Sequence, residues 1–136
     1  MQKKISAAIR KQLICAAVEA RQRAYAPYSR YKVGAAVLTQ SGTMYVGCNV
    51  ENVSFGLTVC AERVAIQSAV AQGHTAFKIL VVCTVDGGMP CGACRQVMNE
   101  FSPNLRVWVV TPKGRRIRDC LLTALLPDAF GPDSLA

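Results

Sequence analysis

The chain has 136 residues, of which 51% are hydrophobic, and it carries a formal net charge of +8. The length fits a single domain over residues 1–136, and the hydrophobic content excludes a disordered chain. No apolar run is long enough to cross a bilayer, and Arg10 and Lys11 interrupt any N-terminal signal segment, so we expect no membrane contact. Seven cysteines, an odd number, favour reduced thiols in a cytoplasmic protein over a secreted disulfide scaffold.

Hydrophobic spacing and turn residues divide the chain into helices and strands. Ser6 is placed to cap the first helix, and Pro27 ends it because proline disfavours helix in the residue before it. The apolar run 79–83 is typical of a strand buried on both faces. The expected helices cover 6–26, 60–72, 92–101 and 121–126, and the expected strands cover 32–39, 43–48, 79–83, 105–110 and 115–118.

The first two strands form a hairpin through a turn at 40–42, and helices and strands alternate after it. This order predicts a three-layer α/β/α domain with a mixed sheet of about five strands. The helices expected at 60 and 92 matter most for function. Each follows a loop directly, and each carries a cysteine at its N-terminus.

The main candidate site combines these two helix starts. Cys91 and Cys94 form a Cys-x-x-Cys pair, which by itself also fits a thioredoxin-like redox site. Cys60 adds a third thiolate, and three protein ligands leave one position of a tetrahedral Zn²⁺ open, as in catalytic zinc sites. Glu62 then lies beside the metal without being a ligand, where a proton shuttle is needed.

The alternative to this zinc site is a set of core cysteines, or a structural zinc with a distant fourth ligand. The chain has one histidine, His74, which we expect at the surface near a helix end. The remaining cysteines are expected to be small buried apolar residues, and they are Cys15, Cys48, Cys83 and Cys120. This alternative leaves Glu62 unexplained.

The chain resembles the small zinc-dependent cytidine deaminases of pyrimidine salvage over almost its whole length. The resemblance is carried by the motifs Tyr25-Ala26-Pro27-Tyr28-Ser29, Gly47-Cys48-Asn49-Val50-Glu51-Asn52, Cys60-Ala61-Glu62-Arg63, Pro90-Cys91-Gly92-Ala93-Cys94-Arg95-Gln96 and Phe130-Gly131-Pro132. It implies a cytidine-deaminase-like fold, Zn²⁺ as cofactor, hydrolysis of cytidine and deoxycytidine to uridine and deoxyuridine, and a homotetramer.

The resemblance also implies roles for individual residues. Cys60, Cys91 and Cys94 resemble the zinc ligands, and Glu62 the residue that moves protons from water to the base and the leaving ammonia. The substrate contacts that it implies are Asn49 and Glu51 for the ribose hydroxyls, the Ala61 amide for the base carbonyl, Tyr31 in the base pocket, and Phe130 from a neighbouring subunit. Phe55 stands where the family often has tyrosine, so the binding of the sugar 5′-hydroxyl stays open.

Arg63 follows Glu62 and lies within one helical turn of Cys60. Three thiolates on one Zn²⁺ leave the site with a charge of −1, which weakens the metal as a Lewis acid. A guanidinium donating to a thiolate withdraws part of that charge. We therefore expect Arg63 to compensate charge at the metal.

The same residues allow three other functions to be considered for this chain. The basic charge and the segment 113–118 would suit a deaminase of RNA or DNA, but the aromatics are few and not interleaved with the basic residues. A redox or structural Cys-x-x-Cys protein would not need Asn49, Glu51 or Glu62. A deaminase of an aminonucleoside antibiotic would share the chemistry. We expect a small nucleoside substrate and no nucleic-acid partner, with the charge on a solvated surface.

Overall fold

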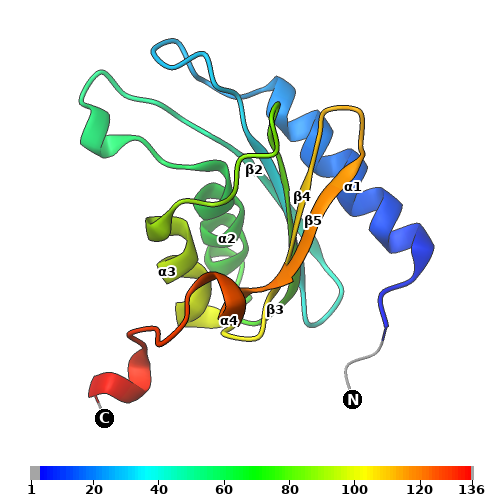
Figure 1. The fold of residues 1–136 in the computed structure, drawn as a ribbon, viewed down its shortest axis with the longest axis vertical. Helices are drawn as coiled ribbons and strands as arrows, with labels where there is room; N and C mark the ends of the chain where they lie inside the picture. The colour runs from blue at the N-terminus through cyan, green and yellow to red at the C-terminus, as the bar shows by residue number, and fades with distance from the viewer. Residues whose placement is uncertain (1–3, 136) are drawn as a thin grey trace.

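The computed structural model describes residues 4–135, in which five strands form one sheet between two layers of helices (Figure 1). The strand order is β2-β1-β3-β4-β5. The strands are β1 Gly34–Thr39, β2 Met44–Cys48, β3 Phe77–Cys83, β4 Arg106–Val110 and β5 Arg116–Leu121. The helices are α1 Ala7–Gln22, α2 Ala61–Ala71, α3 Gly92–Phe101 and α4 Leu122–Leu125, with 3₁₀ turns at Phe55–Leu57 and Pro132–Leu135.

The sheet is mixed, as the sequence predicted. β3 pairs parallel with β4, and the other neighbouring pairs are antiparallel. β3 lies at the centre and is buried along nearly its whole length, which explains its unbroken apolar sequence. α1 covers one face of the sheet, and α2 and α3 cover the other, with a separate hydrophobic cluster on each side. The predicted three-layer α/β/α fold is confirmed.

The first helix is shorter than predicted. Ser6 caps it, accepting a hydrogen bond from the Ile9 amide at 3.2 Å, but the helix ends at Gln22 instead of continuing to residue 26. Tyr25 pairs instead with the extended segment 49–51, through hydrogen bonds to the Asn49 carbonyl and from the Glu51 amide. This long-range pairing ends the helix before Pro27 can.

Two further expectations need correction. Of the four cysteines expected in the core, Cys83 is buried, Cys48 and Cys120 are half-buried, and Cys15 is exposed. Cys15 lies on α1, whose buried residues are Leu13, Ala17 and Ala20, so it occupies the solvent side of that helix. The last strand is also longer than 115–118, because β5 continues to Leu121 beside β4.

α2 packs very closely on β2, and this positions its N-terminus. A Cβ atom at Gly47 would lie 2.4 Å from the Ala65 nitrogen and 2.6 Å from the Ala61 carbonyl oxygen. Any side chain there would push α2 away from the sheet. The loop after β3 leads directly into α3. The N-termini of α2 and α3 lie at the same end of the sheet (Figure 1).

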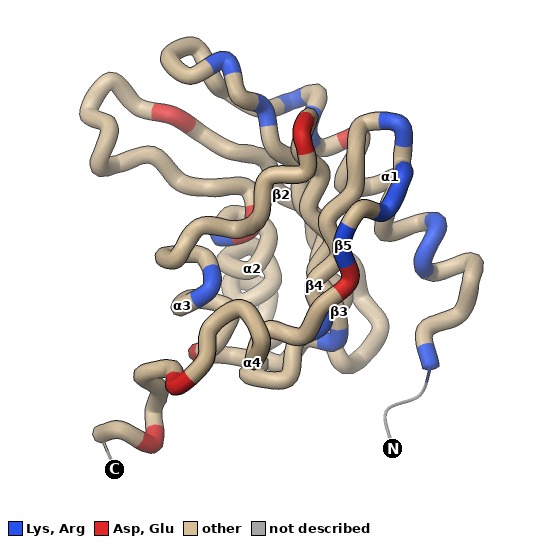
Figure 2. The backbone as a smooth tube through the Cα atoms, viewed as in Figure 1, with Lys and Arg blue, Asp and Glu red and all other residues tan. Residues whose placement is uncertain are grey.

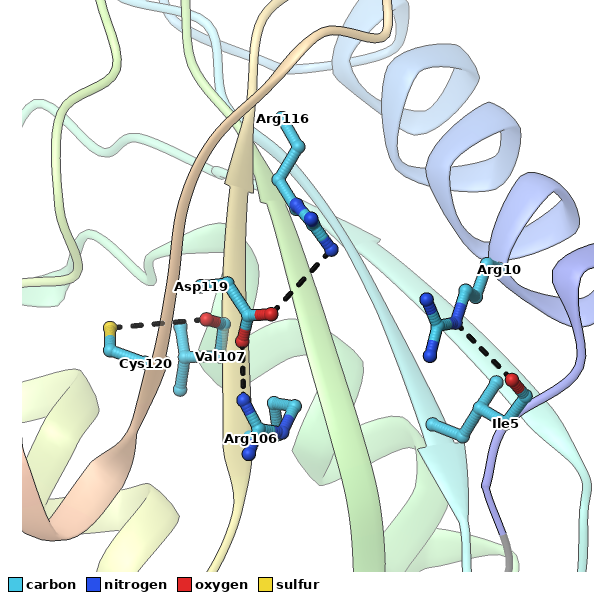
Figure 3. Close-up of polar contacts among 7 residues, drawn as sticks. All are labelled: Ile5, Arg10, Arg106, Val107, Arg116, Asp119 and Cys120. Atoms are coloured by element: carbon cyan, nitrogen blue, oxygen red, sulfur yellow. Dashed lines mark hydrogen bonds and ion pairs between the residues drawn. The ribbon is translucent and has the colours of Figure 1, made fainter.

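Basic residues are spread over α1, the segment before β1, and the β4–β5 hairpin (Figure 2). On β4 and β5, Asp119 accepts from Arg106 at 2.6 Å and lies 3.5 Å from Arg116 (Figure 3). The Arg10 and Arg116 guanidinium groups lie 5.3 and 5.2 Å from the Trp108 ring centre. The positive charge is thus spread over several elements.

Candidate active site

The three candidate thiols meet at the N-termini of α2 and α3. Cys60 and Cys91 are the N-cap residues of these helices, and Cys94 lies in the first turn of α3. The Cys60 and Cys91 sulfurs are 4.0 Å apart, the Cys91 and Cys94 sulfurs are 3.5 Å apart, and all three lie within 4.8 Å of one another. Helix N-termini stabilise negative charge, so this position favours thiolates.

This donor set fits a zinc ion. Sulfurs on a tetrahedral Zn²⁺, with Zn–S bonds of about 2.3 Å, are roughly 3.8 Å apart, close to the spacing found here. Cys94 is buried, whereas Cys60 and Cys91 also line a pocket. No other group of three or more His, Cys, Asp or Glu side chains within residues 4–135 is arranged to hold a metal. Three protein ligands, two of them lining a pocket, are typical of a catalytic site.

Arg63 contacts the Cys60 thiol. Its Nη2 donates to the Cys60 sulfur at 3.3 Å, and its Nε is buried with no protein partner among the described residues. Hydrogen bonds from Cys94 and Arg63 lower the pKa of Cys60 to about 5, and the hydrogen bond to Cys60 raises the pKa of Arg63. A cation therefore lies within hydrogen-bond distance of the Cys60 sulfur, where it favours the thiolate form.

Glu62 is 4% exposed and lines the same pocket as Cys60 and Cys91. Burial, opposed in part by a backbone hydrogen bond, raises its pKa to about 7. A carboxyl group with that pKa can both accept and release a proton near neutral pH. The geometry thus brings a proton-transfer group beside the three thiols.

Asn49 and Glu51 line the same pocket as the Cys60 and Cys91 thiols. Asn49 accepts from the Val33 amide at 2.9 Å and donates to the Tyr31 carbonyl at 2.8 Å. Glu51 accepts from the Tyr28 amide at 2.9 Å, from the Ser29 amide at 3.1 Å and from the Ser29 hydroxyl. The Ser29 hydroxyl is the main cause of a lowered pKa at Glu51, so this carboxylate is ionised at neutral pH.

Most of the predicted site residues share one pocket of about 280 Å³. These are Tyr31, Asn49, Glu51, Cys60, Ala61, Glu62 and Cys91. Phe55 lines an adjoining cavity with Tyr28 and is 73% exposed. Phe130, 60% exposed, lines a larger apolar cavity formed by α2, α3 and the C-terminal segment. The two phenylalanines therefore lie outside the pocket that holds the thiols.

The sequence did not single out Ser29, Thr84, Asp86 or Gly88, although they lie in or beside this pocket. Asp86 and Gly88 lie in the loop between β3 and α3. Their contacts reach across 55 positions of sequence, from Asp86 to Tyr31, so no local spacing could indicate them. Ser29 lies in a quoted motif, but its bond to Glu51 depends on the folded chain.

Residues 8–111 match the family model described as the cytidine and deoxycytidylate deaminase zinc-binding region. The chain belongs to this family. It is 45% identical to a cytidine deaminase from Sporosarcina psychrophila over 127 residues, 91% of this chain and 93% of that protein. It is 44% identical to a cytidine deaminase from Mycobacterium tuberculosis, over 88% of this chain and 87% of the relative.

Solved structures agree with this assignment. The crystal structure of a cytidine deaminase from Burkholderia pseudomallei superposes with a TM-score of 0.83 and is 49% identical. The match covers 88% of this chain and 98% of that one. The predicted resemblance to zinc-dependent cytidine deaminases is therefore confirmed. The matched zinc-binding region contains all three thiols and Glu62. None of the helices in the described part of the chain has the length and apolar character needed to cross a membrane.

Proposed function

We propose that this chain is a zinc-dependent cytidine deaminase that hydrolyses cytidine and deoxycytidine to uridine and deoxyuridine with release of ammonia. One observation carries the proposal: three thiols are spaced for a tetrahedral metal, and two of them, Cys60 and Cys91, share a pocket with the buried Glu62 carboxyl group. Family membership gives the metal and the reaction class. The free nucleoside as substrate rests on the named relatives and on the polar side of the pocket.

In this proposal Cys60, Cys91 and Cys94 hold the zinc. When bound, the metal acts as a Lewis acid that lowers the pKa of a water molecule and so makes it nucleophilic at neutral pH. Glu62 accepts a proton from the attacking water and delivers it to the ring nitrogen next to the reacting carbon. Glu62 then takes the second proton, from the hydroxyl group added to the reacting carbon, and passes it to the departing amino group. Water adds one oxygen to the base, and one ammonia leaves.

The other wall of the pocket orients the nucleoside. Asn49 and Glu51 bind the ribose hydroxyls: Asn49 keeps one N–H and one lone pair after its two backbone bonds, and the Glu51 carboxylate offers further lone pairs. The Ala61 amide, at the first residue of α2, binds the base carbonyl, and Tyr31 lines the base pocket. Arg63 offsets the negative charge of the three thiolates.

The decisive experiment is loss of the ultraviolet absorbance of cytidine by the purified protein, repeated with deoxycytidine and with single-stranded DNA and RNA as competitors. We expect turnover of both nucleosides without inhibition by the polynucleotides. No turnover of either nucleoside would overturn the proposal. Deamination of the polynucleotide in place of the nucleoside would indicate an editing enzyme.

We further propose that the single domain works as a homotetramer in pyrimidine salvage in the cytoplasm, with Phe130 reaching a neighbour's pocket. Phe130 is 60% exposed and borders an apolar cavity of about 600 Å³ between α2, α3 and the C-terminal segment. Such an apolar surface on a small chain favours contact with another copy. Light scattering should give four times the monomer mass, and an active monomer would refute this arrangement.

A further inference from the structure

Tyr31 connects the two walls of the pocket. Its backbone belongs to the sugar side, because its carbonyl accepts from Asn49 at 2.8 Å and its amide donates to the Ser29 hydroxyl at 3.0 Å. Its side chain reaches the loop between β3 and α3. There the Tyr31 hydroxyl donates to the Asp86 carboxylate at 2.6 Å.

That loop carries the metal side, since it runs from Cys83 at the end of β3 to Cys91 at the start of α3. Within it, Asp86 also accepts from the Gly88 amide at 3.0 Å, and the Thr84 hydroxyl donates to the Gly88 carbonyl at 3.3 Å. One carboxylate oxygen of Asp86 therefore holds both the Tyr31 hydroxyl and the loop. The short distance to Tyr31 is typical of a hydrogen bond to a charged acceptor.

Gly88 leaves no room for a side chain. A Cβ atom there would lie 2.4 Å from the Tyr31 hydroxyl oxygen, 3.2 Å from Asp86 Oδ1 and 3.6 Å from the ring carbon that carries the hydroxyl. Gly88 is not among the glycines with positive φ, so its backbone would accept alanine. The main obstacle to a side chain is therefore the hydroxyl group of Tyr31, which phenylalanine at position 31 would remove, while Asp86 Oδ1 would need to shift only by a few tenths of an ångström.

We propose that the contact of Tyr31 with Asp86 and Gly88 sets the width of the pocket, making Tyr31 a positioning residue that holds the sugar wall against the loop bearing Cys91. This inference rests on the proposed function, because the width of the pocket matters only if a nucleoside lies between these walls. The contact acts on substrate binding rather than on proton transfer, since it does not touch Glu62 or the thiols.

The test is a cycle of Gly88→Ala and Tyr31→Phe, singly and together. Loss of a hydrogen bond to a charged group predicts a KM for cytidine about three- to tenfold higher in Tyr31→Phe, with kcat within about twofold. Gly88→Ala should raise KM at least about tenfold with tyrosine present, but change it less than about twofold in the Tyr31→Phe background. An equal cost of Gly88→Ala in both backgrounds would overturn the proposal.

Two more variants separate positioning from general loop damage. Asp86→Asn keeps an acceptor oxygen and should stay within about threefold of the parent KM, whereas Asp86→Ala, which also loses the bond from the Gly88 amide, should raise KM at least as much as Tyr31→Phe. Val85→Ala changes an exposed side chain of the same loop and should leave KM unchanged. Asp86→Ala with the parent KM, or Val85→Ala as damaging as Asp86→Ala, would contradict the assignment.

A readout independent of substrate distinguishes failure of this contact from failure of the proposed function. If the parent does not deaminate cytidine, the proposed function fails. The parent, Tyr31→Phe, Gly88→Ala and the double variant can still be compared by urea unfolding. Gly88→Ala should lower the urea concentration at the unfolding midpoint when Tyr31 is present. In the Tyr31→Phe background it should leave that midpoint nearly unchanged. Additive shifts in both KM and midpoint would show that the Tyr31 hydroxyl and Gly88 do not interact.

Discussion

The two walls of the candidate pocket are built in different ways. On the metal wall, Cys60, Glu62 and Cys91 sit at the starts of two helices that pack on the sheet. On the sugar wall, Asn49 and Glu51 lie on extended backbone held by hydrogen bonds between distant segments. A packed helix end positions its residues together, whereas each hydrogen bond on the sugar wall can be removed separately. Substitutions should therefore cause near-complete loss on the metal wall and graded loss on the sugar wall.

The largest effect is expected from Cys91→Ala. With one of three thiolates removed, we expect zinc content to fall at least about tenfold and deamination to become undetectable, because affinity depends on the full ligand set. Metal analysis of the purified variant measures this directly. Cys15→Ala, at an exposed position on α1, is the matched control and should keep its zinc. Unchanged zinc in Cys91→Ala would refute the ligand assignment.

Glu62→Gln should act on the reaction and not on the metal. Glutamine has the size of glutamate but cannot accept a proton, so kcat should fall about 10³- to 10⁴-fold while zinc content stays at the parent level. Steady-state kinetics and metal analysis on one preparation test both parts. Glu19→Gln, on the exposed face of α1, serves as the control. More than about a tenth of the parent kcat in Glu62→Gln would exclude the proposed role.

Arg63→Gln should have an intermediate effect. The variant loses the charge that faces the Cys60 sulfur at 3.3 Å, so we expect kcat about tenfold lower with zinc retained. Arg63→Lys keeps the charge without the planar fork and should fall between the parent and Arg63→Gln. If all three proteins had the same kcat, the contact would be structural only, and the helix ends would have to stabilise the thiolates alone.

Ser29→Ala should have the smallest effect of these substitutions, because it removes one hydrogen bond to Glu51 and leaves the others in place. The Ser29 hydroxyl is the largest cause of the lowered Glu51 pKa, so its removal should raise that pKa toward the ordinary value. In the parent, the stabilisation from these contacts is present above the ordinary pKa of glutamate and is lost as pH falls through the lowered one. A carbon NMR titration of the Glu51 carboxyl group measures the shift, and an unchanged midpoint would contradict it.

The same contrast explains what could be predicted from the sequence. Cys60, Glu62, Cys91 and Cys94 form two short motifs whose spacing fixes their helix positions, so the structure groups them as expected. The central strand, apart from its first two residues, and the bounds of α3 were equally predictable, from an apolar run and from hydrophobic spacing. The end of α1 was not, because the pairing of Tyr25 with residues 49–51 overrides the local helical pattern.

The arginines of the β4–β5 hairpin bear on pairing between the sheets of different molecules. β5 is an edge strand, whose outer N–H and C=O groups could pair with a strand of another molecule. Arg116 and Arg118 would bring guanidinium groups together in such a pairing, and Asp119 offsets only part of that charge because Arg106 already binds it. The basic edge therefore opposes pairing between the sheets of two molecules. Growth of the sheet into a fibre is disfavoured at this edge by charge, and no helix is needed to cover it.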